Sequence, residues 1–234
     1  MAKDSVNIGL IGLGTIGGGV AGILEKKRDF ITSQLGVPLH LKRAADLDEN
    51  RKQVLPDPES FTTDANLIFD DPDIDIVIEL IGGQSPARGF IERALNSGKH
   101  VVTANKEVIS KHGPELLALA DKKKVGLFYE ASVGGGIPLI APLKRNLQVN
   151  TISAIHTIIN GTTNYILTRM QNEGMEFATA LKEAQSLGYA EADPTSDIEG
   201  DDAAYKIAIL ATIVFHADVR PDEVYREGIS RIAA

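Results

Sequence analysis

The sequence predicts an α/β protein: a doubly wound parallel sheet of the Rossmann type, followed by a second, α+β domain. Three observations predict it. A glycine fingerprint lies between a strand and a helix at the N-terminus, short apolar runs then alternate with helical patterns, and a glycine-rich break after residue 131 changes the pattern. With 234 residues, the chain can hold one large α/β domain and part of a second.

The first element is a short apolar strand over residues 6–11, which runs directly into Gly12-x-Gly14-x-x-Gly17. From Thr15 to Leu35 the apolar positions follow helical spacing. In this context Gly12 permits a tight turn, Gly14 lets backbone amides approach a pyrophosphate, and Gly17 lets the helix pack against the strand. The helix N-terminus adds unpaired N–H groups. We therefore expect a dinucleotide to bind at Gly12, Leu13, Gly14, Thr15, Ile16 and Gly17.

The second strand is expected over residues 39–45, and it ends in an acidic turn. Asp46 lies where a Rossmann domain binds the ribose hydroxyls of adenosine. Arg43, Arg51 and Lys52 are close by in the sequence and suit a 2′-phosphate instead, with Arg51 as our candidate cofactor contact. The same charges also fit a solvated loop. The residues leave the choice between NAD and NADP open.

The remaining strands of the sheet alternate with helices. An almost unbroken apolar run over residues 74–81 is typical of a central strand buried on both faces. The elements expected after it are a helix over 86–96, a strand over 98–103, a helix over 114–124 and a strand over 125–129. Ligands bind parallel sheets at the carboxyl ends of the strands. We therefore expect Gly82, Gly83 and Thr103–Lys106 at the cofactor edge.

The domain boundary is expected at the glycine-rich break. It divides the chain into a dinucleotide-binding domain over 1–131 and a substrate-binding, catalytic domain over 132–234. In the second domain, Thr151–Ile159 alternates like a strand, and helices are expected over 177–187 and 202–216.

Composition and charge narrow the classes of function. The net charge of −8 argues against general binding to nucleic acids or anionic membranes. The absence of cysteine excludes disulfides, thiolate zinc sites and cysteine nucleophiles. No secretory signal pattern opens the chain, and no apolar run approaches the roughly 20 residues that span a bilayer. We expect a soluble, cytoplasmic protein that binds a small molecule, with no nucleic-acid or membrane partner.

An acidic segment in the second half carries the clearest chemistry. Six carboxylates fall within twelve residues of the segment 188–206. Asp202 and Lys206 are four residues apart and share a helix face, and the helix that follows is strongly apolar. Convergent acids suit the ammonium group of an amino acid, and a lysine suits proton delivery to an alkoxide. The alternative is an acidic surface loop with a helix cap and an ordinary ion pair.

Five segments, in order, together resemble the homoserine dehydrogenase family. They are Gly12–Gly17, Thr103–Lys106, Tyr129–Pro138, Asn160–Leu167 and Gly188–Lys206. The resemblance implies NAD(P)-dependent interconversion of L-homoserine and L-aspartate 4-semialdehyde, on the route to threonine, isoleucine and methionine. It also implies a homodimer.

The resemblance implies roles for individual residues. Lys206 resembles the proton donor of the family, with Asp202 in the same pocket. Lys106 matches a second catalytic lysine, which also contacts the cofactor together with Thr103. The residues implied to bind the substrate are Glu191, which grips the amino group, and Asp197, Tyr189, Gly161 and Thr162. A sodium site of mainly backbone carbonyls is implied at Glu130, Val133, Gly135 and Ile137.

Chains of this family usually continue beyond the point that Gly228–Ile232 matches, so we expect this chain to be truncated at its C-terminus. Two alternatives are kept: a non-catalytic dinucleotide-binding fragment, and another two-domain Rossmann oxidoreductase that acts on an amino-acid aldehyde. A semialdehyde dehydrogenase that works through a thiohemiacetal is excluded, because that chemistry needs a cysteine.

Overall fold

The computed structural model describes residues 3–233 and divides into two compact units. The first unit ends at Ser132 and the second begins at Val133. Each unit is described by itself below.

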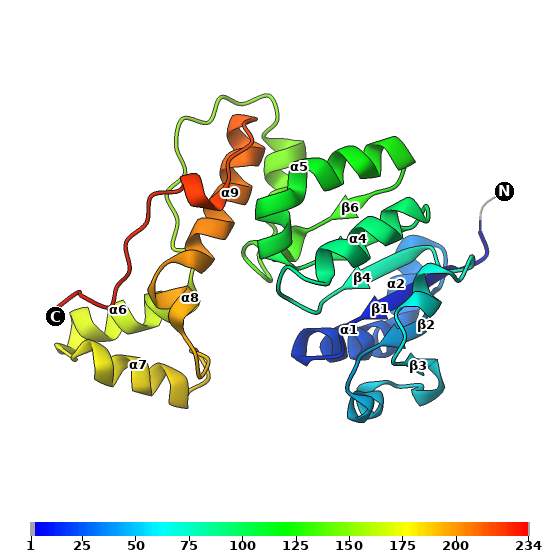
Figure 1. Cartoon of the computed structure of the whole chain (residues 1–234), viewed down its shortest axis with the longest axis horizontal. Helices are drawn as coiled ribbons and strands as arrows, with labels where there is room; N and C mark the ends of the chain where they lie inside the picture. Colours follow the sequence, from blue (N-terminus) through cyan, green and yellow to red (C-terminus); the bar gives the residue numbers. More distant parts are fainter. Residues whose placement is uncertain (1–2, 234) are drawn as a thin grey trace. The chain divides into compact units, whose positions relative to one another are not determined.

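The first unit is built on a six-stranded parallel sheet with the strand order β3-β2-β1-β4-β5-β6 (Figure 1). The strands are β1 (Val6–Ile11), β2 (Leu39–Ala45), β3 (Phe61–Thr62), β4 (Ile76–Glu79), β5 (His100–Thr103) and β6 (Leu127–Phe128). The order reverses between β1 and β4, where Ile11 pairs with Glu79, and Glu79 pairs with Thr103 of β5. A doubly wound sheet binds its ligand at such a reversal. The Rossmann fold predicted for this part of the chain is confirmed.

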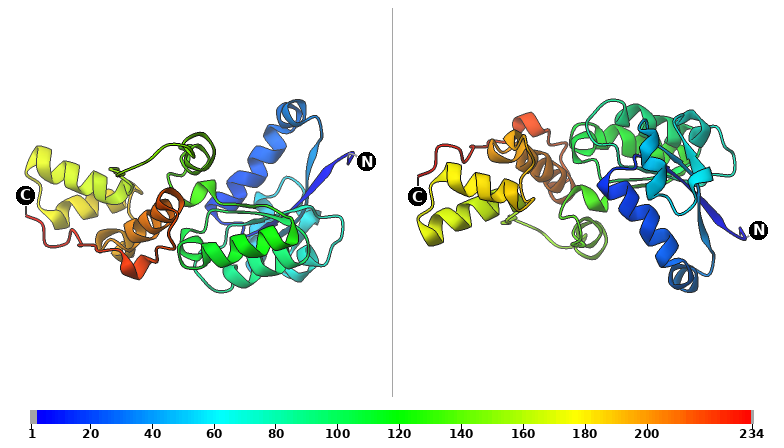
Figure 2. Two further views of the ribbon diagram at one scale, coloured as in Figure 1. Left: turned by 90° about the horizontal axis from the view of Figure 1, so that it is seen from above. Right: turned by 90° about the horizontal axis from the view of Figure 1, so that it is seen from below.

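Helices cover both faces of this sheet. Figure 2 shows α1 (Thr15–Lys26) and α2 (Arg28–Leu35) on one face and α4 (Ala87–Asn96) and α5 (Lys106–Lys123) on the other. The shorter pieces are α3 (Asn66–Phe69), η1 (Glu49–Val54), η2 (Pro58–Ser60) and η3 (Glu130–Ser132). Among the side chains that are fully buried between the layers are Leu10, Leu13, Val77, Ile91, Val101 and Leu116.

Some predicted elements of the first unit differ at their ends. The single helix predicted from Thr15 to Leu35 is two helices, because Lys27 leaves helical geometry with φ −111° and ψ 16°. The helix predicted to start at Pro114 starts at Lys106, since Asn105 caps its N-terminus and Pro114 lies inside it. The elements β3 and α3 were not predicted, because runs of two and four residues carry no periodic signal.

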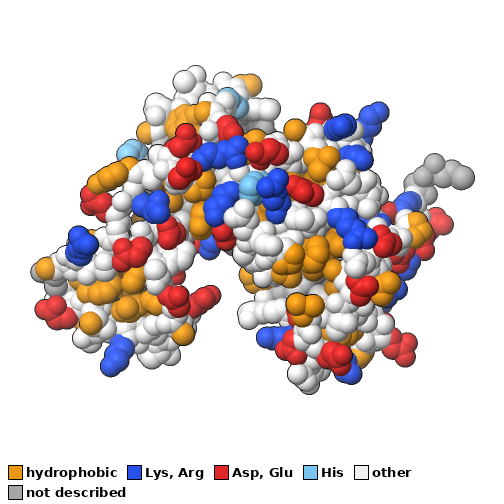
Figure 3. Space-filling model, viewed as in Figure 1, with side chains coloured by type: hydrophobic (Ala, Val, Ile, Leu, Met, Phe, Trp, Pro, Cys, Tyr) orange, Lys and Arg blue, Asp and Glu red, His pale blue; other side chains and the backbone are white. Residues whose placement is uncertain are grey.

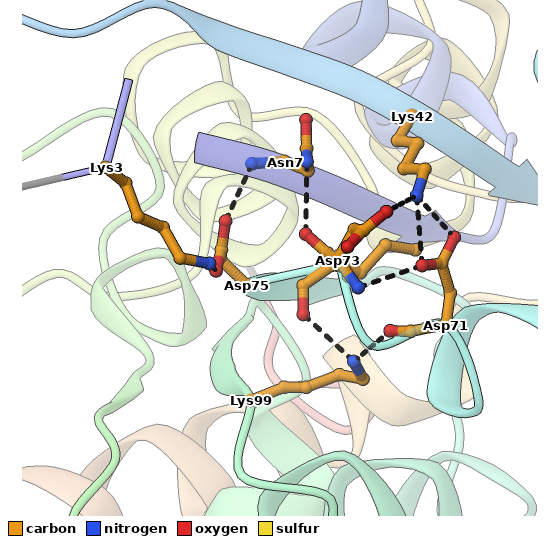
Figure 4. A network of polar contacts seen from close by, with 8 residues as sticks. Lys3, Asn7, Lys42, Asp71, Asp73, Asp75 and Lys99 are labelled. Atoms are coloured by element: carbon orange, nitrogen blue, oxygen red, sulfur yellow. Dashed lines mark hydrogen bonds and ion pairs between the residues drawn. The ribbon is translucent and has the colours of Figure 1, made fainter. Parts of the chain in front are cut away.

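A polar network fixes the loop before β4, at the amino ends of the strands (Figure 4). From β2, the Lys42 ammonium group lies 3.0 Å from Asp71 Oδ1 and 2.9 Å from Asp73 Oδ2. Lys99, before β5, donates to the backbone carbonyl oxygens of Asp71 at 2.5 Å and Ile74 at 2.9 Å. Lys99 is 3% exposed, and burial lowers its pKa below the ordinary value. The network therefore joins β2 and the start of β5 to the loop before β4, at the edge opposite the glycine fingerprint.

Asp75, in the same network, stabilises the unit in its ionised form. Its carboxylate accepts hydrogen bonds from the backbone N–H of Asn7, at 3.0 Å, and from the Lys3 ammonium group. Burial raises the pKa of Asp75, but these hydrogen bonds and the lysine charges outweigh burial and hold the pKa below its ordinary 3.8. Such a carboxyl stabilises the fold above its unfolded pKa, and the contribution is lost as pH falls through the folded pKa.

We expect Asp75→Asn to lower the free energy of unfolding by about 1 kcal/mol at neutral pH. Below pH 3.8 the deficit should shrink, because the native protein loses the same contribution there. Urea unfolding at a series of pH values measures this. Asp4→Asn, at an exposed carboxyl next to Lys3, is the control for the charge change. A deficit that is equal at pH 7 and pH 2 would contradict the prediction.

The regular secondary structure of the second unit is entirely helical within its described residues, 133–233, and irregular segments connect the helices. Its elements are η4 (Pro142–Asn146), α6 (Gly161–Glu173), α7 (Phe177–Ser186), α8 (Thr195–Ile198), α9 (Asp201–Phe215) and η5 (Pro221–Glu223). One core of this unit lies between α6 and α7, where Ile166, Met170, Ala180 and Ala184 are buried. A second buried face belongs to α9, through Ala204, Ala208, Ile209 and Leu210.

The strand predicted over residues 151–159 is not formed. An alternating pattern determines which side chains share a face, but a strand also needs a neighbour that pairs its backbone groups. No described strand pairs with this segment, and Ile158 is 79% exposed. The segment therefore has no regular secondary structure, where a strand was expected.

The surface carries both signs of charge. Figure 3 shows acidic and basic side chains interspersed on the visible face, with hydrophobic side chains gathered over α6 and α7. Within residues 3–233, no helix combines the length and the apolar character needed to cross a membrane.

Candidate active site

The three fingerprint glycines have different surroundings. Gly12 has φ +94°, and a Cβ there would lie 2.8 Å from the backbone of Leu80. A Cβ at Gly17 would lie 1.8 Å from the carbonyl oxygen of Gly12, whereas a Cβ at Gly14 would meet nothing within 4 Å. The fold therefore requires glycine at positions 12 and 17, while Gly14 borders open space.

The N-terminus of α1 lies beside this open space. The helix begins at Thr15 with no capping side chain and no acidic residue in its first turn. Gly14, Thr15 and Ile16 are exposed, so this helix end is accessible and can bind an anion. Leu13 differs from them: its side chain is fully buried, and its N–H donates to Asp46 Oδ2 at 2.7 Å. Leu13 thus orients the turn from within the core.

A cavity of 620 Å³ opens at the carboxyl edge of the sheet. Its lining includes Gly12, Gly14, Asp46, Arg51, Gly82 and Phe90. Both Asp46 oxygens accept backbone hydrogen bonds, from Leu13 and, at 3.0 Å, from Asp48. Arg51 is about half exposed, and its Nε lies 3.5 Å from Asp48 Oδ2. The cavity has the size of a small-molecule site and carries an acid and a base at one end.

A buried carboxylate joins the loops that follow β4 and β5. Glu79 is 0% exposed and accepts hydrogen bonds from the Ile81 N–H at 2.9 Å and the Thr103 hydroxyl at 2.7 Å. The Thr103 hydroxyl oxygen accepts from the Asn105 N–H at 2.9 Å. The Thr103 side chain therefore lies in the interior, although its position on the chain suggested a cofactor contact.

Asn105 completes this connection. Its side-chain oxygen caps α5 by accepting from the Val108 N–H at 3.1 Å, and its Nδ2 donates to the Gly83 carbonyl at 2.7 Å. Lys106 is the first residue of α5 and so begins where this cap holds the chain. We name Glu79, Thr103 and Asn105 the edge network. Sequence reasoning missed Glu79, whose signal was a lone carboxylate inside an apolar run.

In the second unit, Lys206 lies on the second turn of α9 with its side chain 16% exposed. Its Nζ is 2.7 Å from Asp202 Oδ2 and donates to the Ile159 carbonyl oxygen at 2.9 Å. Asp202 is 1% exposed. These contacts engage two of the three ammonium protons of Lys206. The expected pairing of Asp202 and Lys206 on one helix face is confirmed, and the pair is mostly buried.

Asn160 connects this pair to a second acid. Its Nδ2 donates to Asp202 Oδ2 at 2.8 Å and to Asp197 Oδ1 at 2.7 Å. Its Oδ1 accepts from the Thr163 N–H at 2.8 Å and caps α6. One amide therefore contacts α6, α8 and α9. Sequence reasoning quoted Asn160 within a motif but assigned it no role.

Other predicted substrate residues surround Asp197. The Thr162 hydroxyl lies 2.8 Å from Asp197 Oδ2 and 2.7 Å from the Tyr189 carbonyl oxygen. The Tyr189 ring stacks on Tyr165, with centroids 4.7 Å apart, and is 57% exposed. Gly161, the exposed first residue of α6, follows Asn160 directly. The network thus gathers Asp197, Thr162, Tyr189, Asp202 and Lys206.

Glu191 is separate from these contacts. It is exposed, and its backbone carbonyl accepts from Gln185 Nε2 at 3.1 Å. No hydrogen bond or ion pair of its side chain is found within residues 3–233. Its carboxylate is therefore accessible to a ligand from solvent.

The four residues implied to bind sodium are divided between the units. Glu130 is in the first unit, and Val133, Gly135 and Ile137 are in the second. Gly134 and Gly135 have φ +79° and +49°, and the Gly134 carbonyl accepts from the Ile137 N–H at 2.8 Å. Among residues 3–233, no three or more histidine or carboxylate side chains are grouped as a metal site. Any cation here would depend on backbone carbonyls.

Comparisons with known proteins agree with this arrangement. A family model described as homoserine dehydrogenase, NAD binding domain, matches residues 12–130, and one described as homoserine dehydrogenase matches residues 138–234. A homoserine dehydrogenase of Synechocystis is 48% identical over 230 residues, which are 98% of this chain and 53% of the relative.

Solved structures give the same result. A homoserine dehydrogenase from Thiobacillus denitrificans has a TM-score of 0.93 and 46% identity, covering 98% of this chain and 53% of that one. A hyperthermophilic archaeal homoserine dehydrogenase mutant in complex with NADPH has a TM-score of 0.84 and 31% identity, covering 97% of this chain and 75% of that one. The chain spans about half the length of the curated relatives it matches. Since family models match both units, the chain belongs to the homoserine dehydrogenase family.

Proposed function

We propose that this chain contributes to NAD(P)-dependent interconversion of L-homoserine and L-aspartate 4-semialdehyde. The first unit, with the predicted boundary at residue 131, would bind the dinucleotide, and the second would bind the amino acid. The observation that carries the proposal is the Lys206 ammonium group. It is mostly buried, held by Asp202 and the Ile159 carbonyl, and it keeps one proton outside these two contacts.

Lys206 is the proposed general acid. Reduction of the aldehyde places negative charge on its oxygen, and an oriented ammonium group stabilises that charge and donates a proton to it. Asp202 fixes the direction of the ammonium group. Lys106, at the start of α5, is proposed as the second lysine of the reaction on the basis of the family resemblance. Bound NAD(P)H would supply the hydride.

The substrate ammonium group is proposed to bind Glu191 and Asp197. Glu191 is accessible and its side chain makes no hydrogen bond or ion pair within the described residues, while Asp197 is held by Asn160 and Thr162. Tyr189 and Gly161 would form the wall beside them. A loop carboxylate together with an anchored one suits an amino acid, because the anchored group sets the position and the loop group adjusts to the ligand.

The dinucleotide fits the glycine turn and the cavity beside it. Gly14 leaves room for a pyrophosphate at the uncapped N-terminus of α1, and the cavity of 620 Å³ continues from there past Asp46 and Arg51. Asp46 suits ribose hydroxyls, and Arg51 suits a 2′-phosphate. Titration with NADPH and with NADH decides which contact dominates.

The function is tested by NADPH oxidation with L-aspartate 4-semialdehyde. Because the chain spans about half of its relatives, two forms are compared: the chain itself, and a fusion that continues it with the remaining residues of the Synechocystis relative. Turnover in either form supports the proposal. NADPH binding without turnover in both forms would favour a binding fragment instead.

We expect Gly14→Leu to weaken NADPH binding by at least tenfold, on the order of 1.4 kcal/mol. The new side chain has room in the folded unit, so it would fill the space proposed for the pyrophosphate. Fluorescence titration measures the affinity, and thermal unfolding shows that the variant is folded. Gly19→Leu, at an exposed glycine of the same helix with equal room, is the matched control. Equal affinities of the two variants would refute the assignment.

Three further properties are proposed on the family resemblance. Glu130, Val133, Gly135 and Ile137 would bind sodium, which a thermal-shift comparison of sodium and potassium chloride tests. The complete protein would be a homodimer, which sedimentation tests. It would reside in the cytoplasm, which cell fractionation tests.

A further inference from the structure

We propose that Asn160 is a positioning residue for the reaction. Its amide holds Asp197 and Asp202 on either side of one nitrogen, and through Asp202 it orients Lys206. The inference deepens the proposed function and rests on it.

The contacts of Asn160 determine which way its amide faces. The side-chain oxygen caps α6 through the Thr163 N–H, so the Nδ2 group must face the opposite side. Both of its protons are donated there, at 2.7 Å to Asp197 and 2.8 Å to Asp202. Asn160 is 8% exposed, and these three bonds use both donors and the acceptor of the amide.

Helix capping alone does not account for asparagine at this position. Aspartate and serine cap helices about as well, because a cap needs only a side-chain acceptor. Asparagine adds two donors to the same acceptor. Both donors are used by carboxylates, and each hydrogen bond stabilises the charge of Asp202, which is 1% exposed. The residue type is thus explained by the acids that it contacts.

The same short segment also contacts Lys206 directly. The Ile159 carbonyl accepts from Lys206 Nζ, and the next residue, Asn160, donates to the Asp202 oxygen that Lys206 also contacts. Residues 159 and 160 therefore both bear on the ammonium group, Ile159 by direct contact and Asn160 through Asp202. A shift of this backbone would displace the proton donor and both acids together.

Two variants separate the bridging role from the cap. Asn160→Asp and Asn160→Ser each retain a capping acceptor, and neither offers two donors to Asp197 and Asp202. In whichever of the two forms is active, we expect both to lower kcat at pH 8 at least tenfold while the KM for NADPH stays unchanged. A general loss of stability would not lower kcat selectively while it left the KM for NADPH unchanged.

The pH profile provides a second, specific readout. In Asn160→Asp, the introduced carboxyl group faces Asp197, Asp202 and Lys206, and once protonated it regains one O–H donor. Its kcat relative to that of Asn160→Ser should therefore rise between pH 8 and pH 6. If both variants keep kcat within twofold of the parent and the profiles coincide, the inference is wrong.

A labelling experiment tests the same claim without turnover, so failure of the proposed function can be told apart from failure of this inference. A pulse of acetic anhydride, read by mass spectrometry, measures the reactivity of Lys206. In Asn160→Ser, Lys206 should react at least threefold faster than in the parent, while the exposed Lys182 on α7 reacts equally in both. An unchanged Lys206 rate overturns the inference. If the unsubstituted protein shows no turnover, that result contradicts the proposed reaction but not the role of Asn160.

Discussion

Replacing Lys206 with alanine is expected to reduce turnover by roughly 10²- to 10⁴-fold, the usual contribution of a positioned general acid. NADPH affinity should not change, because the glycine turn and its cavity belong to the first unit. The measurement is kcat for L-aspartate 4-semialdehyde reduction beside a fluorescence titration with NADPH. Turnover within about threefold of the parent would place the proton donor elsewhere, with Lys106 as the first residue to examine.

The buried ion pair complicates this substitution. Without Lys206, Asp202 loses a charged partner in a site where it is 1% exposed, and breaking a buried pair costs about 3–5 kcal/mol. Lys206→Arg therefore serves as the folded test, because it keeps the charge. It should also be nearly inactive, since guanidinium does not release a proton near neutral pH. Lys206→Ala combined with Asp202→Asn removes the uncompensated charge and provides a second stable variant.

Gly17→Ala is expected to destabilise the first unit by about 3 kcal/mol or more. Its Cβ would lie 1.8 Å from the Gly12 carbonyl oxygen. Because the atoms that it would meet belong to the backbone of Gly12, no flexible side chain can move aside. Relief would require α1 to separate from the turn that follows β1. Chemical denaturation of the first unit measures the loss.

The neighbouring glycine provides the control. A Cβ at Gly18 would lie 3.4 Å from Val54 Cγ2, an ordinary contact with a side chain. Alanine also favours a helix over glycine by about 1 kcal/mol, so Gly18→Ala should be neutral or stabilising. If both variants have the same stability, the close approach of α1 to the glycine turn is not the reason for glycine at position 17.

The sheet and its cofactor edge were predictable because their signals are local. Apolar runs interrupted by glycine give the strands, and the reading of Gly12, Gly14 and Gly17 needs only the strand before them and the helix after them. The pairing of Asp202 with Lys206 follows in the same way from the helix period. The sodium ligands and the substrate roles depended on resemblance and stay predictions.

The contacts that hold the candidate site together were not predictable, because they join residues far apart in the chain. Asn160 meets Asp197 and Asp202 across 37 and 42 residues, and Glu79 meets Thr103 across 24. One missed element did have a local signal. The helix α6 has an asparagine cap at Asn160, apolar residues four apart and a glycine after its end.

The alternating segment 151–159 shows the opposite error, because a strand was predicted there and none is formed. Its pattern is clear, but strand formation depends on a neighbour, and no pattern within one segment reveals whether a neighbour is present. The backbone groups of a strand are satisfied only by pairing. Helices α6, α7 and α9 did not depend on such a partner, because a helix satisfies most of its own backbone groups.

The edge network has a thermodynamic consequence. Glu79, Thr103 and Asn105 connect the loops after β4 and β5 and the start of α5 through hydrogen bonds within the protein itself. Ordering a loop residue costs about 1–2 kcal/mol of conformational entropy, and here that cost is met during folding. A dinucleotide arriving at this edge would lose its own freedom but would not have to immobilise these loops. Its association should therefore carry a small entropy penalty from the protein, and weakening the Glu79 contacts should lower affinity through entropy without removing any group that touches the ligand.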